Sequence, residues 1–182
     1  MRVILPNQLG AKTMQVKLCG RVSKLTELEP GTLFLSRSNR ETMFGCAVTW
    51  GRDRGAILFS RSLLPKEVCP CVVEETSLKI ADVVALPEAM LVPALSENHL
   101  QFTSNTADGP GMLTLFSDRT VLRVLQHSNA FAYVDLNAGR ATPNPPHGGI
   151  EVPRWSIQHL DVAGNATTLF EFDGPKPFSR AR

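Results

Sequence analysis

Arginine and serine close two nearly identical stretches of this chain. Residues 31–38 read GTLFLSRS and residues 55–62 read GAILFSRS. An arginine guanidinium binds phosphate or carboxylate through paired N–H donors, and serine hydroxyls add further hydrogen bonds. If the two stretches end at one edge of a sheet, their arginines predict an anion-binding surface, which we call the arginine rim. Its members are Arg37, Arg40 and Arg61, with Arg119 added by the similar stretch LFSDR at 115–119.

The repeat also has a purely structural interpretation. Glycine opens a strand after a turn, an apolar run fills the core, and serine with arginine marks the return to water. The stretch between the two copies alternates, with large apolar residues on one face and smaller ones on the other. We therefore expect consecutive antiparallel strands at 31–37, 43–50 and 55–60. The first and third then run the same way, which brings their arginines to one edge.

His147 stands in the proline-rich loop TPNPPHGG, residues 142–149. Prolines stiffen the loop before it and glycines follow it, which is one way to present a side chain beside a site. With Asp135 it is the candidate for an acid–base pair, if the fold brings both side chains within reach of one bound group. The structural alternatives are a solvated loop histidine and, for Asp135, a cap of the turn that follows it.

Cys69 and Cys71 flank a proline and lie on one side of the segment if it is extended. A structural zinc site needs four ligands, usually in two close pairs, whereas the other cysteines and the four histidines are scattered. We therefore expect packed or partly exposed thiols and no metal site. The sequence also lacks the G-x-S-x-G nucleophile motif and the common glycine-rich phosphate motifs, so it implies no cofactor.

Composition narrows the class of partner. The 182-residue chain has a formal net charge of +2 at pH 7, far from the basic balance of a dedicated nucleic-acid-binding protein. Nucleic acid or a phosphate ligand is therefore only an alternative partner, bound weakly through the arginine rim. The sequence shows no run of about 18 apolar residues and no secretion signal. It predicts a soluble, cytoplasmic protein without a membrane partner.

The fold class follows from short segments separated by thirteen glycines and thirteen prolines. The segments predict a mainly β protein, either two packed antiparallel sheets or a partly closed barrel, with one or two short helices. One helical turn is expected within 86–95, starting at Pro87. We expect a single domain over 1–182, with a subdivision near 105–111 and a peripheral tail at 174–182. Further strands are expected at 112–116, 120–125 and 130–136, and a hairpin from 152–160 to 166–172.

These observations favour a binding or accessory protein over an enzyme, because no catalytic motif is present. The expected partner is another protein, or a second copy of this chain, met through an exposed sheet edge or the arginine rim. The alternatives are the weak phosphate or nucleic-acid binder and an enzyme with dispersed residues near the 142–149 loop.

Overall fold

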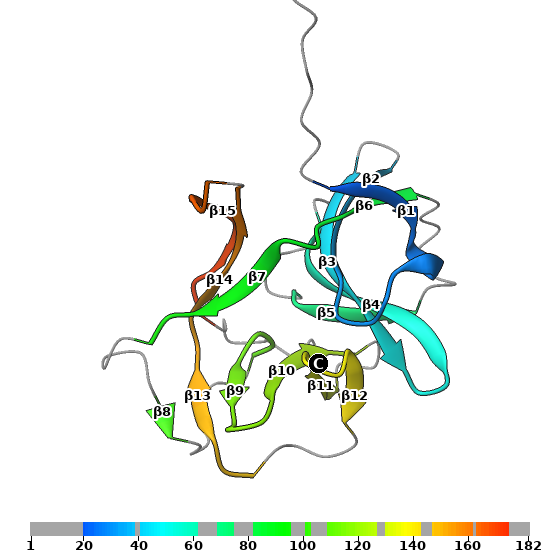
Figure 1. Ribbon diagram of the computed structural model, residues 1–182. Coiled ribbons are helices and arrows are strands. Elements are labelled where there is room, and N and C mark those ends of the chain that lie inside the picture. The colour runs from blue at the N-terminus through cyan, green and yellow to red at the C-terminus, as the bar shows by residue number, and fades with distance from the viewer. Residues whose placement is uncertain are drawn as a thin grey trace, which may run out of the picture.

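The chain forms two β-sheets with almost no helix (Figure 1). The computed structural model describes residues 20–38, 41–61, 69–74, 82–95, 101–102, 109–126, 130–142, 147–161 and 163–174. The larger sheet contains β1 (Arg21–Lys24), β2 (Leu33–Ser38), β3 (Glu41–Trp50), β4 (Asp53–Arg61), β5 (Cys71–Glu74), β6 (Asp82–Ala85), β8 (Gln101–Phe102), β9 (Leu113–Leu115), β10 (Thr120–Leu125), β11 (Phe131–Asp135), β12 (Arg140–Thr142) and β13 (Ile150–Val152). The small sheet contains β7 (Ala89–Pro93), β14 (Trp155–Leu160) and β15 (Ala166–Phe172). The predicted mainly β class is confirmed.

Strand β3 lies at the centre of the larger sheet and is buried on both faces. Phe44, Cys46 and Val48 pack into one core, and Met43 and Ala47 pack into a second. The sequence predicted the first of these faces as the heavy buried one. The second is also buried, because segments from the N-terminal part of the chain cover it.

Six strands of the larger sheet pair in a partly closed ring. The pairing runs from β3 through β4, β5, β10, β11 and β12 and back to β3. Two of these contacts join parallel strands, and each registers one residue pair, Leu125 with Cys71 and Arg140 with Thr49. At the second contact the N–H of Thr49 donates to the Gly139 carbonyl at 2.7 Å. The ring therefore closes through short contacts, while its antiparallel pairs are longer.

Apolar side chains from the ring strands fill its interior, and aromatic residues of the small sheet pack against them. The Trp155 ring lies 5.5 Å from Phe59 of β4 and stacks at 5.1 Å on Phe172 of β15. Its Nε1–H donates to the Gly111 carbonyl at 2.8 Å. The small sheet is therefore held to the ring by one continuous core. The buried interior residues of the ring are Phe44, Cys46, Val48, Ile57, Phe59, Val72, Leu122, Val124 and Val134.

The second core lies on the opposite face of β3 and β4. It is covered by β6, by β2 and by a short 3₁₀ helix, η1 (Leu25–Glu27), which is the only helix in the described part of the chain. Because this core and the ring interior share the same strands, both faces of β3 and β4 are buried over residues 43–48 and 55–59. Its buried residues are Leu25, Leu28, Phe34, Met43, Ala47, Ala56, Leu58, Cys69, Cys71, Val83, Ala85 and Leu125.

The helical turn predicted within 86–95 is wrong. Pro87 lies in a turn in which the N–H of Ala89 donates to the Leu86 carbonyl at 3.1 Å, and the chain then forms strand β7. Pairing with β14 overrides the local helical signal, because it satisfies the backbone groups of β7 and lets Leu91 pack against the ring interior.

The remaining sequence predictions concern the later strands, the subdivision of the chain, its tail and membrane spans. The strands predicted at 112–116, 120–125 and 130–136 and the final hairpin are confirmed as β9, β10, β11 and the β14–β15 pair. The predicted subdivision at 105–111 falls largely outside the described residues, as does the tail at 174–182 apart from Gly174. In the part of the chain that is described, no helix is long and apolar enough to span a membrane.

Candidate functional site

The two repeated stretches occupy the two sides of β3. Leu33 of β2 and Ile57 of β4 both pair with Cys46, so the first halves of the repeat stand at equivalent places. Both strands are antiparallel to β3 and therefore run in the same direction. The predicted order of three consecutive antiparallel strands is confirmed, and the repeat has a structural role in building this sheet.

A β-bulge in β4 separates the ends of the two copies. The register between β3 and β4 shifts between Phe44 and Gly45, so that Arg61 pairs with Met43. Arg37, at the same place in the other copy, pairs with Thr42. The two positions share one end of β3, but one extra residue in β4 moves them out of the same row.

Only part of the arginine rim lies within the described residues. Arg37 is exposed on β2. For Arg61 the backbone is described but the side chain is not, and Arg40 lies outside the described residues. The rim as an anion site therefore stays a prediction.

Arg119 and His147 lie near a different turn, between β9 and β10. Arg119 is exposed, and its Cζ lies 5.0 Å from the centre of the Phe116 ring. A Cβ added to Gly149 would meet the same ring at 2.9 Å, so the exposed His147 is two residues away from a segment that packs on Phe116. The surroundings of these two residues are thus the β9–β10 turn rather than the ends of β2 and β4.

Asp135 caps the turn that follows it, which was the structural one of its two predicted roles. Its Oδ1 accepts hydrogen bonds from the N–H groups of Asn137 at 2.9 Å and Ala138 at 3.0 Å. The carboxylate therefore fixes the β11–β12 turn. Its use as a base together with His147 stays a prediction.

The described cysteines are thiols packed in the cores. Cys69 and Cys71 lie in the second core, and Cys46 lies in the ring interior. Burial raises the pKa of the Cys46 thiol to about 12, and a hydrogen bond with the Gly31 backbone opposes this only in part. Such a thiol is a poor nucleophile at neutral pH. Over the described residues, no three His, Cys, Asp or Glu side chains gather as a metal-binding group.

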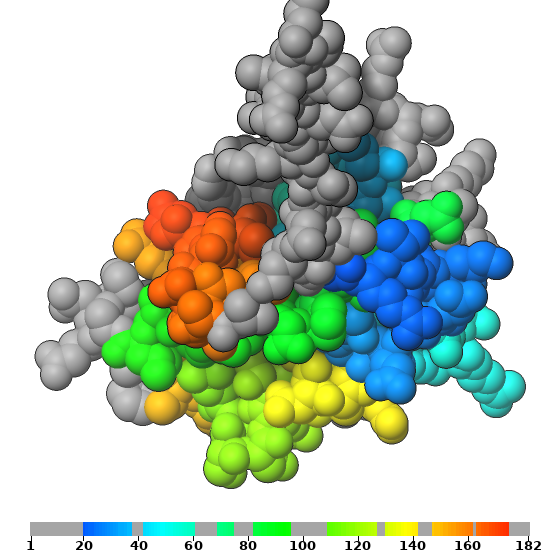
Figure 2. Space-filling model, turned by 45° about the horizontal axis from the view of Figure 1, so that its top comes forward, coloured from blue at the N-terminus to red at the C-terminus, as the bar shows by residue number. Residues whose placement is uncertain are grey.

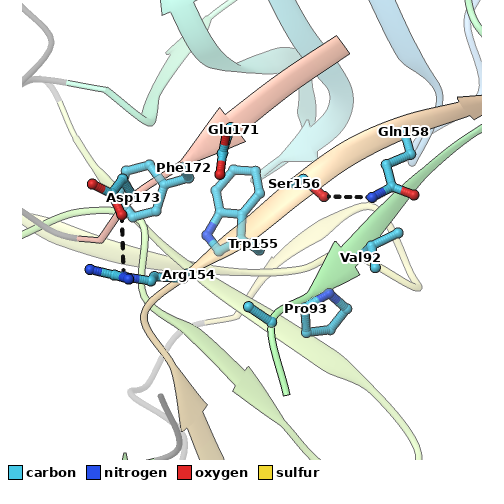
Figure 3. A pocket seen from close by; sticks show the side chains of 10 residues that line it. Val92, Pro93, Arg154, Trp155, Ser156, Gln158, Glu171, Phe172 and Asp173 are labelled. Carbon is cyan, nitrogen blue, oxygen red and sulfur yellow. Dashed lines mark hydrogen bonds and ion pairs between the residues drawn. The ribbon is translucent and has the colours of Figure 1, made fainter. Parts of the chain in front are cut away.

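A pocket of about 320 Å³ lies across the small sheet at the end where β14 begins (Figure 3). All three strands contribute to it, with Val92 and Pro93 from β7, Ser156 and Gln158 from β14, and Glu171 from β15. The backbone register explains the grouping, because Ser156 pairs with Val92 on one side and with Glu171 on the other. The remaining lining residues are Ala94, Arg154, Trp155, Phe172 and Asp173.

The pocket combines apolar walls with polar groups on the outer face of the small sheet. Trp155 and Ile157 of β14 point into the core, so the alternate residues Ser156 and Gln158 face outward. Gln158 Nε2 donates to Ser156 Oγ at 3.1 Å. At the end of the pocket, Arg154 Nε and Asp173 Oδ1 form an ion pair at 3.2 Å. This set suits binding by hydrogen bonds and apolar contact.

Strand β15 forms an open edge beside this pocket. Among the described strands it pairs only with β14, and its orange-red atoms reach the molecular surface in Figure 2. Residues 166–169 are all exposed, and the strand contains one charged residue, Glu171, and no proline. Inward-facing Phe170 and Phe172 pack on Trp155 at 5.6 and 5.1 Å, which holds the strand in place.

The other strand edges are shorter or carry features that discourage pairing. β1 has four residues, of which Arg21 and Lys24 are charged, and β8 has two residues. β7 ends in Pro93, which has no N–H to offer an added strand. Charge, proline and shortness are the common means by which proteins block edge pairing. β15 has seven residues, no proline and a single charged residue, Glu171, although a bulge opposite the Ile157–Gln158 step interrupts its register.

Sequence reasoning placed the β14–β15 hairpin but not the pocket or the open edge. The alternation in WSIQHL shows that Ser156 and Gln158 share a face. It does not show that β7, more than 60 residues earlier in the chain, lies next to them.

A scan against protein-family models, a search of curated proteins and a search of solved structures each gave no match to this chain. The site is therefore interpreted from its own geometry.

Proposed function

We propose that this chain is a non-enzymatic binding protein that takes an extended segment of a partner protein alongside β15. In this mode of recognition the partner adds a strand to an exposed sheet edge, main-chain hydrogen bonds supply affinity, and neighbouring pockets supply selectivity. The observation that carries the proposal is the seven-residue edge of β15, which pairs on one side only among the described strands.

Three features of β15 support this role. Its inner face is anchored by Phe170 and Phe172 in the aromatic cluster, so a partner would meet an ordered edge. Its outer side chains are mostly uncharged, so they do not repel an incoming strand. The pocket of the small sheet opens directly beside the edge, at Glu171.

The test is a selection of random short displayed peptides against the purified full chain, followed by amide hydrogen exchange. Bound peptides are expected to slow the exchange of outward-directed amides in β15 and to leave β1 and β7 unchanged. Protection elsewhere, or no selected peptide at all, would overturn the proposal. Native mass at the same concentration shows whether a second copy of the chain occupies the edge instead.

Proline variants provide a matched pair for this test. Successive strand amides point to opposite neighbours, so one of Thr167 and Thr168 directs its N–H to β14 and the other directs it to the open edge. Proline at whichever threonine directs its N–H to the open edge removes a hydrogen-bond donor from that edge only. That variant is expected to stay folded and lose peptide binding, while the other loses stability. If both variants unfold, exchange protection in the unmodified chain decides.

A further inference from the structure

The pocket of the small sheet contains one negative charge that its lining does not balance. Arg154 and Asp173 neutralise each other in their ion pair. Glu171 is exposed, and among the described residues that line the pocket Arg154 is the only cation. The resulting negative electrostatic potential favours a positively charged group over a neutral or negative one.

The neutral polar groups of the pocket also suit a hydrogen-bond donor. Gln158 uses its Nε2 to donate to Ser156 Oγ, which leaves its amide oxygen as an acceptor. The Glu171 carboxylate accepts hydrogen bonds only. Lysine and arginine head groups donate hydrogen bonds only, so they complement acceptors such as the Glu171 carboxylate at the β15 side of the pocket.

The register of β15 places one residue of an added strand in the same row. Val92, Ser156 and Glu171 stand side by side across the small sheet, and neighbouring strands are about 5 Å apart. A partner residue opposite Glu171 would therefore face the pocket side and lie roughly 10 Å from the Ser156 strand. A short side chain at that position stops beside Glu171, whereas a long one reaches past its carboxylate.

We infer that the pocket of the small sheet selects a lysine or arginine side chain at the position of the added strand opposite Glu171. This inference rests on the proposed function, and it names the class of partner segment that the edge recognises. The basic head group pairs with the Glu171 carboxylate across the row, at the β15 side of the pocket. Because the carboxylate is exposed, the selectivity weakens as salt concentration rises.

The experiment uses one selected peptide that slows exchange in β15, with the residue opposite Glu171 varied between lysine, norleucine and glutamate. Norleucine keeps the apolar stem and removes the charge. On the unmodified chain the lysine peptide is expected to bind about three- to tenfold more tightly than the norleucine peptide. The E171Q variant should reduce this preference to less than about twofold, and E171K should reverse it in favour of the glutamate peptide. E74Q removes the same charge from an exposed position on β5 and should leave the preference intact.

The outcomes separate the inference from the function on which it rests. Peptides that protect β15 without any preference for lysine overturn the inference and leave the proposed function standing. A preference that survives E171Q also overturns the inference, because another group then provides the selectivity. If no peptide protects β15, both fail.

Discussion

The ring and the small sheet are built from the same alternation of side chains but differ in how their strands end. Strand β4 of the ring has β3 on one side and β5 on the other, and both of its faces are buried. Strand β15 has one described neighbour, a buried inner face and an exposed outer face. In a closed ring the backbone N–H and C=O groups form hydrogen bonds within the molecule. At an open edge these groups stay available to a strand of another chain. Under the proposed function, this difference separates stability, in the ring, from recognition, on the small sheet.

The largest effect is expected where the two regions join. Trp155 is 2% exposed, packs on Phe59, Phe170 and Phe172, and donates a hydrogen bond to Gly111. W155A should lower the free energy of unfolding by about 3–5 kcal/mol, because it leaves a cavity and an unpaired carbonyl. Urea unfolding measures this change.

The matched control for that substitution is W50A, since Trp50 is only partly buried at the end of β3. W50A should lower the free energy of unfolding clearly less than W155A does. Equal losses would contradict the view that Trp155 is the particular anchor between the ring and the small sheet.

A second, smaller effect tests ring closure. Gly139 has a φ of +61°, and an added Cβ would lie 2.5 Å from the Pro30 backbone, beside the hydrogen bond that joins β12 to β3. Gly51 has a similar φ of +64°, but nothing lies within 4 Å of its added Cβ. G139A should therefore cost roughly 2–4 kcal/mol, and G51A about 1 kcal/mol.

Thermal and urea unfolding of both variants check this difference. Similar losses of stability for the two variants would mean that the positive φ alone sets the cost. The contact between β12 and β3 would then shift at little cost in free energy.

The smallest effect on stability at neutral pH concerns the buried thiol of Cys46 inside the ring. Because burial raises the pKa of Cys46 to about 12 from 9.0, the folded state holds the thiol proton more tightly than the unfolded state. Its contribution to stability is therefore complete below pH 9 and is lost as pH rises toward 12. The slope is about 1.4 kcal/mol per pH unit within that window.

The check is the difference in free energy of unfolding between the unmodified chain and C46A, measured from pH 8 to about pH 11 so that other alkaline titrations cancel. C46A should lose stability at pH 8 through its cavity and then show a shallower decline. A parallel decline in both proteins would show that water reaches Cys46 in the folded ring.

The sequence predicted much of the local structure, because local residues determine it. The alternation around Cys46 placed β3, and the two copies of the repeat placed β2 and β4. The position of Asp135 before a turn predicted its capping role. The candidate site was harder to predict: Arg37 and Arg61 share one end of β3, but the bulge that offsets them has no clear sign in the sequence. The helical turn expected in 86–95 was wrong because a strand far along the chain, β14, supplies the hydrogen bonds of β7.

By itself the sequence determined the strand-rich composition, the paired stretches and the side of each strand that carries large apolar residues. These depend on the two-residue period of a strand and on turn residues, which are properties of adjacent positions. Only the tertiary structure decided which strands meet, that β3 is buried on both faces, and that β15 pairs with β14 alone among the described strands. The physical reason is that backbone hydrogen bonds and core packing join residues far apart in the chain, and a neighbour's absence at an edge is fixed only once every other strand has found its place.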